Sequence, residues 1–289
     1  MSGRIVRQAG IGVAVVVIAV GTLVAESHKE YRFNVSPKSG LSVNNPYGSI
    51  SVKPSTGNTV VVTALLHSDK VEVDNSQTGN RVDVQSHLLS GADSETGRVD
   101  YDILVPADAS ITLHSSTGTL HAEKLHGDVT LEGAGATVDV RDISNAHVHV
   151  KTLNGAVTLT NVQEGHVEVD SLSGLVTLDR VTGPLVQVIS TSGSINYAGD
   201  FGDGGEYRLT SHSGNIEAVV VDTTSAEVSA RSVNGEVRDD IPLQPKTHSW
   251  FDVQAGRAFM GTMGRAAASS TVVLRSFSGK IHLRKRSAK

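Results

Sequence analysis

The stretch Asn154-Gly-Ala-Val-Thr-Leu-Thr-Asn-Val-Gln-Glu-Gly-His-Val-Glu-Val169 decides the fold of this chain. Its aliphatic residues alternate with polar ones, and the pattern returns when the sequence is shifted by 19 residues in either direction. The aliphatic positions are Val157, Leu159, Val162, Val167 and Val169, then Val176, Leu178, Val181, Val186 and Val188, and before them Val138, Val140, Ile143, Val148 and Val150. Period-2 alternation is typical of strands with one buried face. Each unit therefore predicts two short strands that face a common interior.

A corner motif separates the strands. The pattern [Ser/Thr]-x-[Ser/Thr/Asn]-Gly occurs seven times, at 115–118, 152–155, 171–174, 190–193, 211–214, 232–235 and 276–279. Glycine tolerates positive φ, and a short polar side chain before it can bond its own backbone. We therefore expect a sharp turn with a positive φ at each of these glycines.

A unit of about 20 residues buries too little apolar surface to fold by itself, so it must stack on copies of itself. The predicted fold is an all-β, single-stranded parallel β-solenoid with about 19–21 residues per coil and right-handed winding. We expect one solenoid domain over residues 26–289. It would contain irregular N-terminal coils (31–110), regular repeats (111–240), an insertion (241–270) and a terminal coil (271–283).

The first 25 residues have the features of a targeting segment. Arg4 and Arg7 precede an uncharged apolar run from Ala9 to Ala25. Its length lies between that of a signal-peptide core and that of a bilayer-spanning helix. Residues 1–25 therefore predict either a cleaved signal peptide or an uncleaved anchor, with membrane contact through residues 8–25 in the second case. In both cases the rest of the chain is exported, to the periplasm, the cell surface or the medium.

Composition excludes several classes of protein. The 289 residues contain no Cys, which rules out disulfide scaffolds, Cys-ligated zinc and thiol catalysis. The net charge of −5 gives no basic footprint for nucleic acid. Aromatic residues make up only 4% of the chain, so the core must be aliphatic.

Several segments resemble a bacterial β-strand-repeat family labelled "putative adhesin". They are Leu41–Val43, Gly48–Val52, Val99–Pro106, the Ser-x-Ser-Gly series, Gly261–Gly264 and Leu274–Ile281. The resemblance covers about 31–283. It implies an envelope-associated solenoid and brings no catalytic residues with it.

Two groups of polar residues suggest metal sites. Stacking by 19 residues places His147 beside His166 and His149 beside Glu168, a donor set that zinc could use. Because these residues alternate with buried valines, a solvated outer face explains them better. Asp200, Asp203 and Glu206 in a Gly-rich loop could ligate calcium, although their spacing matches no calcium motif and favours a surface loop. We predict no cofactor.

Catalytic and aromatic candidates are few. Arg238-Asp239-Asp240 is the most suggestive acid–base cluster, but no second cluster aligns with it, so we expect no enzyme. Aromatic rings gather in two places, either as surface-binding groups or as pins that hold insertions to the solenoid. They are Trp250, Phe251 and Phe259 in the late insertion, and Tyr197, Phe201 and Tyr207 near the acidic loop.

The predicted function is a non-catalytic envelope protein with an adhesin-like binding or structural role. We expect its partner to be an envelope protein or a cell-wall polymer, and not nucleic acid. The alternatives are a polysaccharide-active β-helix enzyme and an accessory protein of an envelope-stress sensing system.

Overall fold

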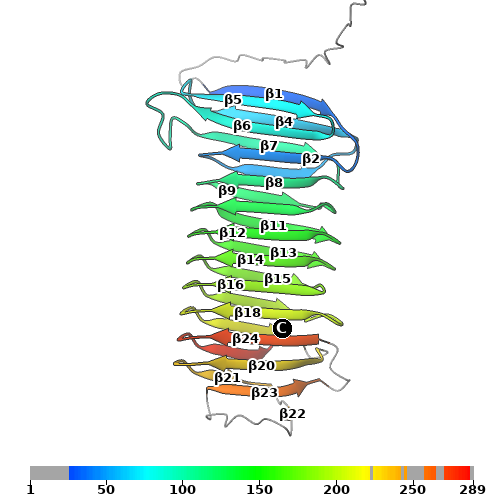
Figure 1. Cartoon of the computed structure of the whole chain (residues 1–289), viewed down its shortest axis with the longest axis vertical. Coiled ribbons are helices and arrows are strands. Elements are labelled where there is room, and N and C mark those ends of the chain that lie inside the picture. The colour runs from blue at the N-terminus through cyan, green and yellow to red at the C-terminus, as the bar shows by residue number, and fades with distance from the viewer. Residues whose placement is uncertain (1–25, 222–223, 242–243, 246–256, 265–269, 287–289) are drawn as a thin grey trace, which may run out of the picture.

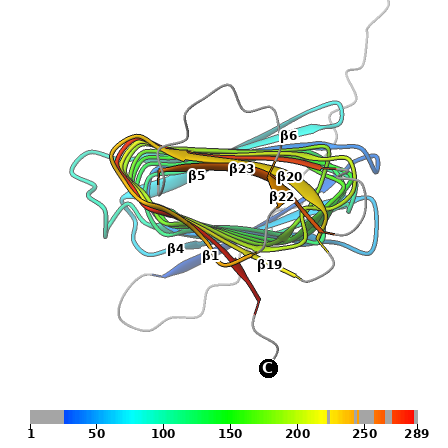
Figure 2. The ribbon, with the colours of Figure 1, turned by 90° about the horizontal axis from the view of Figure 1, so that it is seen from below.

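The computed structural model describes residues 26–221, 224–241, 244–245, 257–264 and 270–286, and the segment 1–25 lies outside this range. Two long β-sheets face each other and enclose a flattened interior, and the coils stack along the long axis of the molecule (Figures 1 and 2). One contiguous hydrophobic core fills this interior from Tyr31 to Leu283. The all-β solenoid with two strands per coil is therefore confirmed, while its right-handed winding stays a prediction. Within the described residues, no helix has the length and apolar character needed to cross a membrane.

The strands divide between two sheets, here called sheet A and sheet B. Sheet A contains, in spatial order, β1 (Ser27–Asn34), β4 (Thr59–Leu66), β7 (Val99–Val105), β3 (Ile50–Pro54), β9 (Thr119–Glu123), β11 (Thr137–Ser144), β13 (Val157–Gln163), β15 (Val176–Val181), β17 (Ile195–Gly199), β19 (Ile216–Val220), β25 (Ile281–Lys285) and β21 (Val237–Asp239). Sheet B contains β22 (Gln244–Pro245), β23 (Ala258–Met263), β20 (Ala226–Ser232), β24 (Ser270–Ser276), β18 (Glu206–Ser211), β16 (Leu185–Ser190), β14 (His166–Ser171), β12 (His147–Thr152), β10 (Val129–Gly133), β8 (Ser110–Ser115), β2 (Gly40–Asn45), β6 (Arg81–Leu88) and β5 (Val71–Thr78).

The predicted 19-residue register is confirmed in the central coils. Val157 pairs with Val176 in sheet A, and Val169 pairs with Val188 in sheet B. Every predicted interior aliphatic of the three central units is at most 1% exposed. Each coil therefore sets its aliphatic side chains on those of the coil before it, in continuous interior columns.

The corner glycines are needed for a reason other than the predicted one. Of the seven, all within the described residues, only Gly118 has a positive φ, of 85°. At Gly174 a Cβ would lie 1.9 Å from the carbonyl oxygen of Gly155, and at Gly193 it would lie 2.0 Å from that of Gly174. The glycine thus permits the backbone of one coil to approach that of the next, and the expectation of positive φ was wrong for the other six corners.

Polar side chains of the motif bond the backbone at several corners. The first residue is buried, and at Thr152, Ser211, Ser232 and Ser276 its hydroxyl accepts a hydrogen bond from the glycine N–H, as in Ser211 with Gly214 (2.8 Å). The third residue donates to the preceding coil at Ser173, Ser192 and Ser213, as in Ser192 to the carbonyl of Leu172 (3.1 Å). At these corners the bond to the motif's own backbone is made by the first residue and not, as we had predicted, by the third.

The last coil in sequence is not the last coil in space. We predicted a terminal coil over 271–283, but β24 lies between β18 and β20 (Figure 1). In the other sheet, β25 lies between β19 and β21. The corner glycines follow the same order, since Gly279 packs on Gly214 and Gly235 packs on Gly279. All coils present the same alternation to their neighbours, so sequence order alone does not choose which coils touch.

The N-terminal region is a cap and not a series of successive coils. The β2–β3 coil stacks directly on the β8–β9 coil, and the strands that lie between them in the sequence fold beyond it. There, β4 is antiparallel to both β1 and β7, and β5 is antiparallel to β6. Antiparallel pairing gives the open edges of the first parallel strands a partner.

The C-terminal edge of sheet B is a short strand that contains a proline. Pro245 lies in β22, the edge strand of this sheet, and a proline has no backbone N–H to offer to a further strand. In sheet A, Arg284 of β25 lies within the stack and bonds Glu217 of β19.

Candidate functional site

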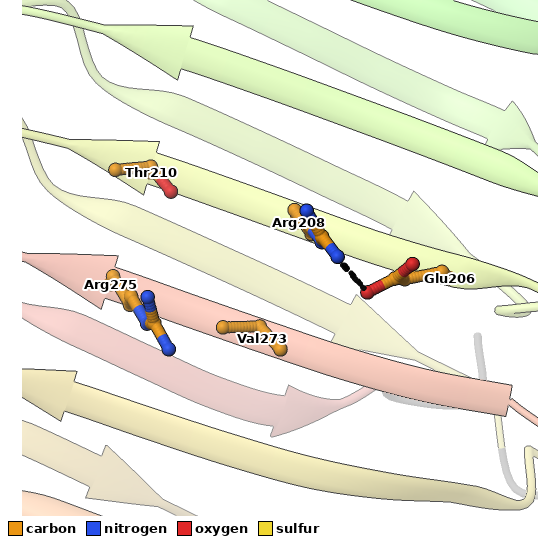
Figure 3. Close-up of a pocket in the computed structure, with 5 residues that line it drawn as sticks. All are labelled: Glu206, Arg208, Thr210, Val273 and Arg275. Atoms are coloured by element: carbon orange, nitrogen blue, oxygen red, sulfur yellow. Dashed lines mark hydrogen bonds and ion pairs between the residues drawn. The ribbon is translucent and has the colours of Figure 1, made fainter.

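The C-terminal part of sheet B carries a depression of about 360 Å³, lined by Glu206, Arg208, Thr210, Val273 and Arg275 (Figure 3). These residues come from the neighbouring strands β18 and β24, in which Arg208 lies opposite Val273 and Thr210 opposite Arg275. The outward positions of parallel strands form columns along the stack. A short valine between longer side chains leaves the hollow.

Of the three arginines at or beside this depression, one is paired with a carboxylate of the described residues and two are not. Arg208 bonds Glu206 through both Nη2 (2.6 Å) and Nε (2.7 Å). Arg275 lies opposite Arg231 of β20 on its other side. Among the described residues neither Arg231 nor Arg275 has an acidic partner, and both side chains are exposed. The site therefore offers two free guanidinium groups on adjacent strands.

An exposed ridge borders the depression at the corner. It consists of the second motif residues His212, Phe277 and Val233, which follow β18, β24 and β20. The rings of His212 and Phe277 are stacked, with centroids 4.9 Å apart and planes 4° apart. Phe277 is 46% exposed and Val233 42% exposed. An apolar edge therefore runs beside the two free arginines.

The predicted histidine group has the expected register but not the geometry of a metal site. His147 pairs with His166, and their rings are stacked with centroids 5.0 Å apart, while Nδ1 of His149 lies 3.5 Å from Oε2 of Glu168. The nitrogen lone pairs of an imidazole lie in the ring plane, so stacked rings do not direct them at one ion. In the described part of the chain, no three His, Asp or Glu side chains converge to hold a metal.

The acidic loop and its aromatic neighbours form a pinned insertion. Tyr197, Phe201 and Tyr207 are fully buried, and the Tyr197 and Phe201 rings are stacked at 4.7 Å. Burial raises the pKa of Tyr207 to about 12. The Glu206 carboxylate, one of the suggested calcium ligands, is bonded to Arg208. These rings therefore anchor the insertion and are not a binding surface.

The acid–base cluster at 238–240 gains a partner that sequence did not suggest. His282 of β25 bonds Asp240 (Nε2 to Oδ2, 2.7 Å), and Arg238 bonds the other carboxylate oxygen (3.1 Å). The hydrogen bond from His282 and then that from Arg238 lower the pKa of Asp240. Asp239 is exposed. Both ends of this carboxylate are thus occupied by neighbouring side chains.

The third aromatic group is only partly described. Trp250 and Phe251 lie outside the described residues, whereas Phe259 of β23 is half-buried and packs against the core. Sequence reasoning missed Arg231, Arg275, His212 and Phe277, which lie far apart in the chain. The corner motif could have indicated them, because its second residues form one column along the stack. Which of these residues are neighbours, however, depends on the order of the coils in space.

Comparisons with known proteins identify the family. A family model described as Toastrack DUF4097 matches residues 39–284. A solved "putative adhesin" from Bacteroides fragilis is 12% identical, with a TM-score of 0.49 over 91% of this chain and 100% of that one. A "putative adhesin" from Parabacteroides distasonis is also 12% identical (TM-score 0.41; 91% and 98% covered), and a "putative cell adhesion protein" from Clostridium sporogenes is 14% identical (TM-score 0.29; 90% and 100% covered).

No significant match to a curated protein was found. The family model covers most of the chain, from β2 to β25, including both the regular coils and the coil that inserts between earlier ones. The chain therefore belongs to the Toastrack DUF4097 family.

Proposed function

We propose that this chain is an exported, non-catalytic envelope protein with an adhesin-like role, which binds its partner through the outer faces of the solenoid. One observation carries the proposal. The outward positions of the coils form columns of mainly polar and charged side chains along both sheets.

Such a surface suits many weak contacts. Each coil repeats similar outward groups at a spacing of about 4.8 Å, so a polymer that runs along the axis can contact several coils at once. Linked contacts raise overall affinity without a deep pocket. The uncharged apolar run before residue 26 supports export.

An enzyme would need a different arrangement. General acid–base catalysis requires partners held within reach of one reacting group. In the candidate cluster, Asp240 is held between His282 and Arg238, while Asp239 is exposed at the last coil. These contacts explain the cluster as a surface ion-pair network.

Co-sedimentation of the full-length chain with isolated bacterial envelopes tests the proposal, with an unrelated acidic protein of similar size as control. Saturable binding of this chain, in excess of the control, is the expected result. Absence of binding would refute the proposed function. Turnover of pectin, alginate or peptidoglycan that Asp240→Asn abolishes without unfolding the chain would establish the enzyme instead.

A further inference from the structure

We propose that Arg231 and Arg275, with the adjoining depression and corner ridge, form a binding site for a carboxylated polysaccharide. This inference rests on the proposed function and assigns a ligand class to one part of the solenoid surface. Three observations support it. Neither arginine has an acidic partner among the described residues, the strand register places the two side by side, and a depression and an exposed ridge border them.

Six arginines elsewhere on the solenoid are neutralised in one recurring way. Each bonds a carboxylate two residues away, in the same strand or directly beside its end. The pairs are Arg32–Glu30, Arg81–Asp83, Arg98–Asp100, Arg141–Asp139, Arg208–Glu206 and Arg238–Asp240.

At the proposed site, neither arginine has a carboxylate two residues away. The residues two positions from Arg275 are Val273 and Phe277, and those two positions from Arg231 are Ser229 and Val233. In the part of the chain that the structure describes, neither arginine forms an ion pair. At these two adjacent positions the chain therefore lacks the carboxylate that it provides at six others.

The register places the two free charges together. Arg231 and Arg275 are directly opposite on parallel strands, where Cα atoms lie about 4.8 Å apart. Like charges directly opposite destabilise a sheet. An anionic ligand would remove this repulsion, which no side chain of the described residues does.

The surroundings complete a site for an extended polymer. The depression over Val273 lies on the side of Arg275 away from Arg231, and the ridge formed by His212, Phe277 and Val233 lies at the end of the same strands. A guanidinium group binds a carboxylate through charge-assisted hydrogen bonds, as Arg208 does on this face with Oε1 of Glu206. Successive coils are about as far apart as successive sugars of an extended chain, so neighbouring arginines can meet neighbouring uronate groups.

The test measures binding of the full-length chain to polygalacturonate as the probe, by biolayer interferometry. The Arg231→Gln/Arg275→Gln double variant is compared with Arg81→Gln, an exposed arginine of the same sheet that already bonds Asp83. We expect the double variant to weaken binding about tenfold or more, since it removes both charge-assisted contacts to the polymer. Arg81→Gln should stay within about twofold of the wild type, and binding should weaken with added salt.

Three results would overturn the inference: no binding of polygalacturonate, equal affinities of the double variant and the wild type, or tighter arginine-dependent binding of polyphosphate, which would assign a phosphate polymer instead. Far-ultraviolet circular dichroism confirms that each variant is folded. The envelope co-sedimentation described above separates the two proposals. If the double variant binds polygalacturonate normally while the chain still binds envelopes, the polysaccharide site is wrong and the proposed function stands.

Discussion

Gly174→Ala tests the stacking of the corner glycines. The new Cβ would lie 1.9 Å from the carbonyl oxygen of Gly155 and 2.7 Å from its carbonyl carbon. Real Cβ atoms do not approach other atoms closer than 3.0 Å, so the two coils must separate locally by about 1.1 Å, the difference between 3.0 Å and 1.9 Å. Both contacts are backbone atoms, so no side chain can rotate away to relieve them.

The cost follows from the hydrogen bonds at this corner. Leu172 N donates to Thr152 O at 3.1 Å, and Ser173 N donates to Leu153 O at 2.9 Å. A separation of this size lengthens both to about 4 Å, beyond the range of a hydrogen bond. Two lost bonds at ~1 kcal/mol each, together with lost packing, predict a destabilisation of about 2–4 kcal/mol.

A urea melt followed by far-ultraviolet circular dichroism measures this change. With a slope of about 3 kcal/mol per molar urea, the midpoint should fall by about 1 M. The matched control is Gly57→Ala, since a methyl group added at Gly57 would meet no atom within 4 Å and the φ angle there is not positive. Its midpoint should stay unchanged or rise slightly. Equal shifts for the two variants would refute the close-approach explanation.

Other perturbations test the interior columns and the order of the coils. Val169→Asp places a charge in the interior, where Val169 is 1% exposed, and should cost about 3 kcal/mol or more, whereas His147→Ala on the outer face should stay within about 0.5 kcal/mol in the same urea melt. Equal midpoint shifts would contradict the register. The chain has no Cys, so paired cysteines report neighbours directly: Ser229→Cys with Val273→Cys should form a disulfide, because these residues are opposite in β20 and β24. Arg208→Cys with Ser229→Cys should not form one, because β24 separates the two strands by about 10 Å in all. Non-reducing electrophoresis with thiol titration detects each disulfide. A disulfide in the second pair alone would mean that β18 lies directly beside β20, and it would contradict the insertion of β24 between them.

The candidate site shows why local sequence patterns were not enough to predict the functional residues. The side chains of His212, Phe277 and Val233 are exposed because each is the second residue of its corner motif and follows the buried serine that ends its strand. Their contact could not be inferred, since Phe277 belongs to a coil that is 65 residues away in the chain from the coil on which it stacks, as the bond between Lys280 and Asn215 shows.

Spacing along the chain was enough to predict the coil length, the residues of the interior columns and the exposure of the polar positions. These features depend on alternation within a strand and on the turn between strands, which are local properties of 19–21 residues. Val169 beside Val188 and His147 beside His166 could therefore be predicted correctly from spacing alone.

The three-dimensional arrangement was needed to show which coils touch at the two ends and why the corners need glycine. Coils with the same alternation offer equivalent edges, so inserting β24 and β25 between earlier coils leaves the periodic pattern unchanged, and the choice depends on contacts between segments distant in sequence. The glycine requirement likewise comes from the distance between stacked backbones, as at Gly279 on Gly214, and not from the φ angle of a single turn. The free arginine pair exists for the same reason, because Arg231 and Arg275 become neighbours only when the last coil enters the stack.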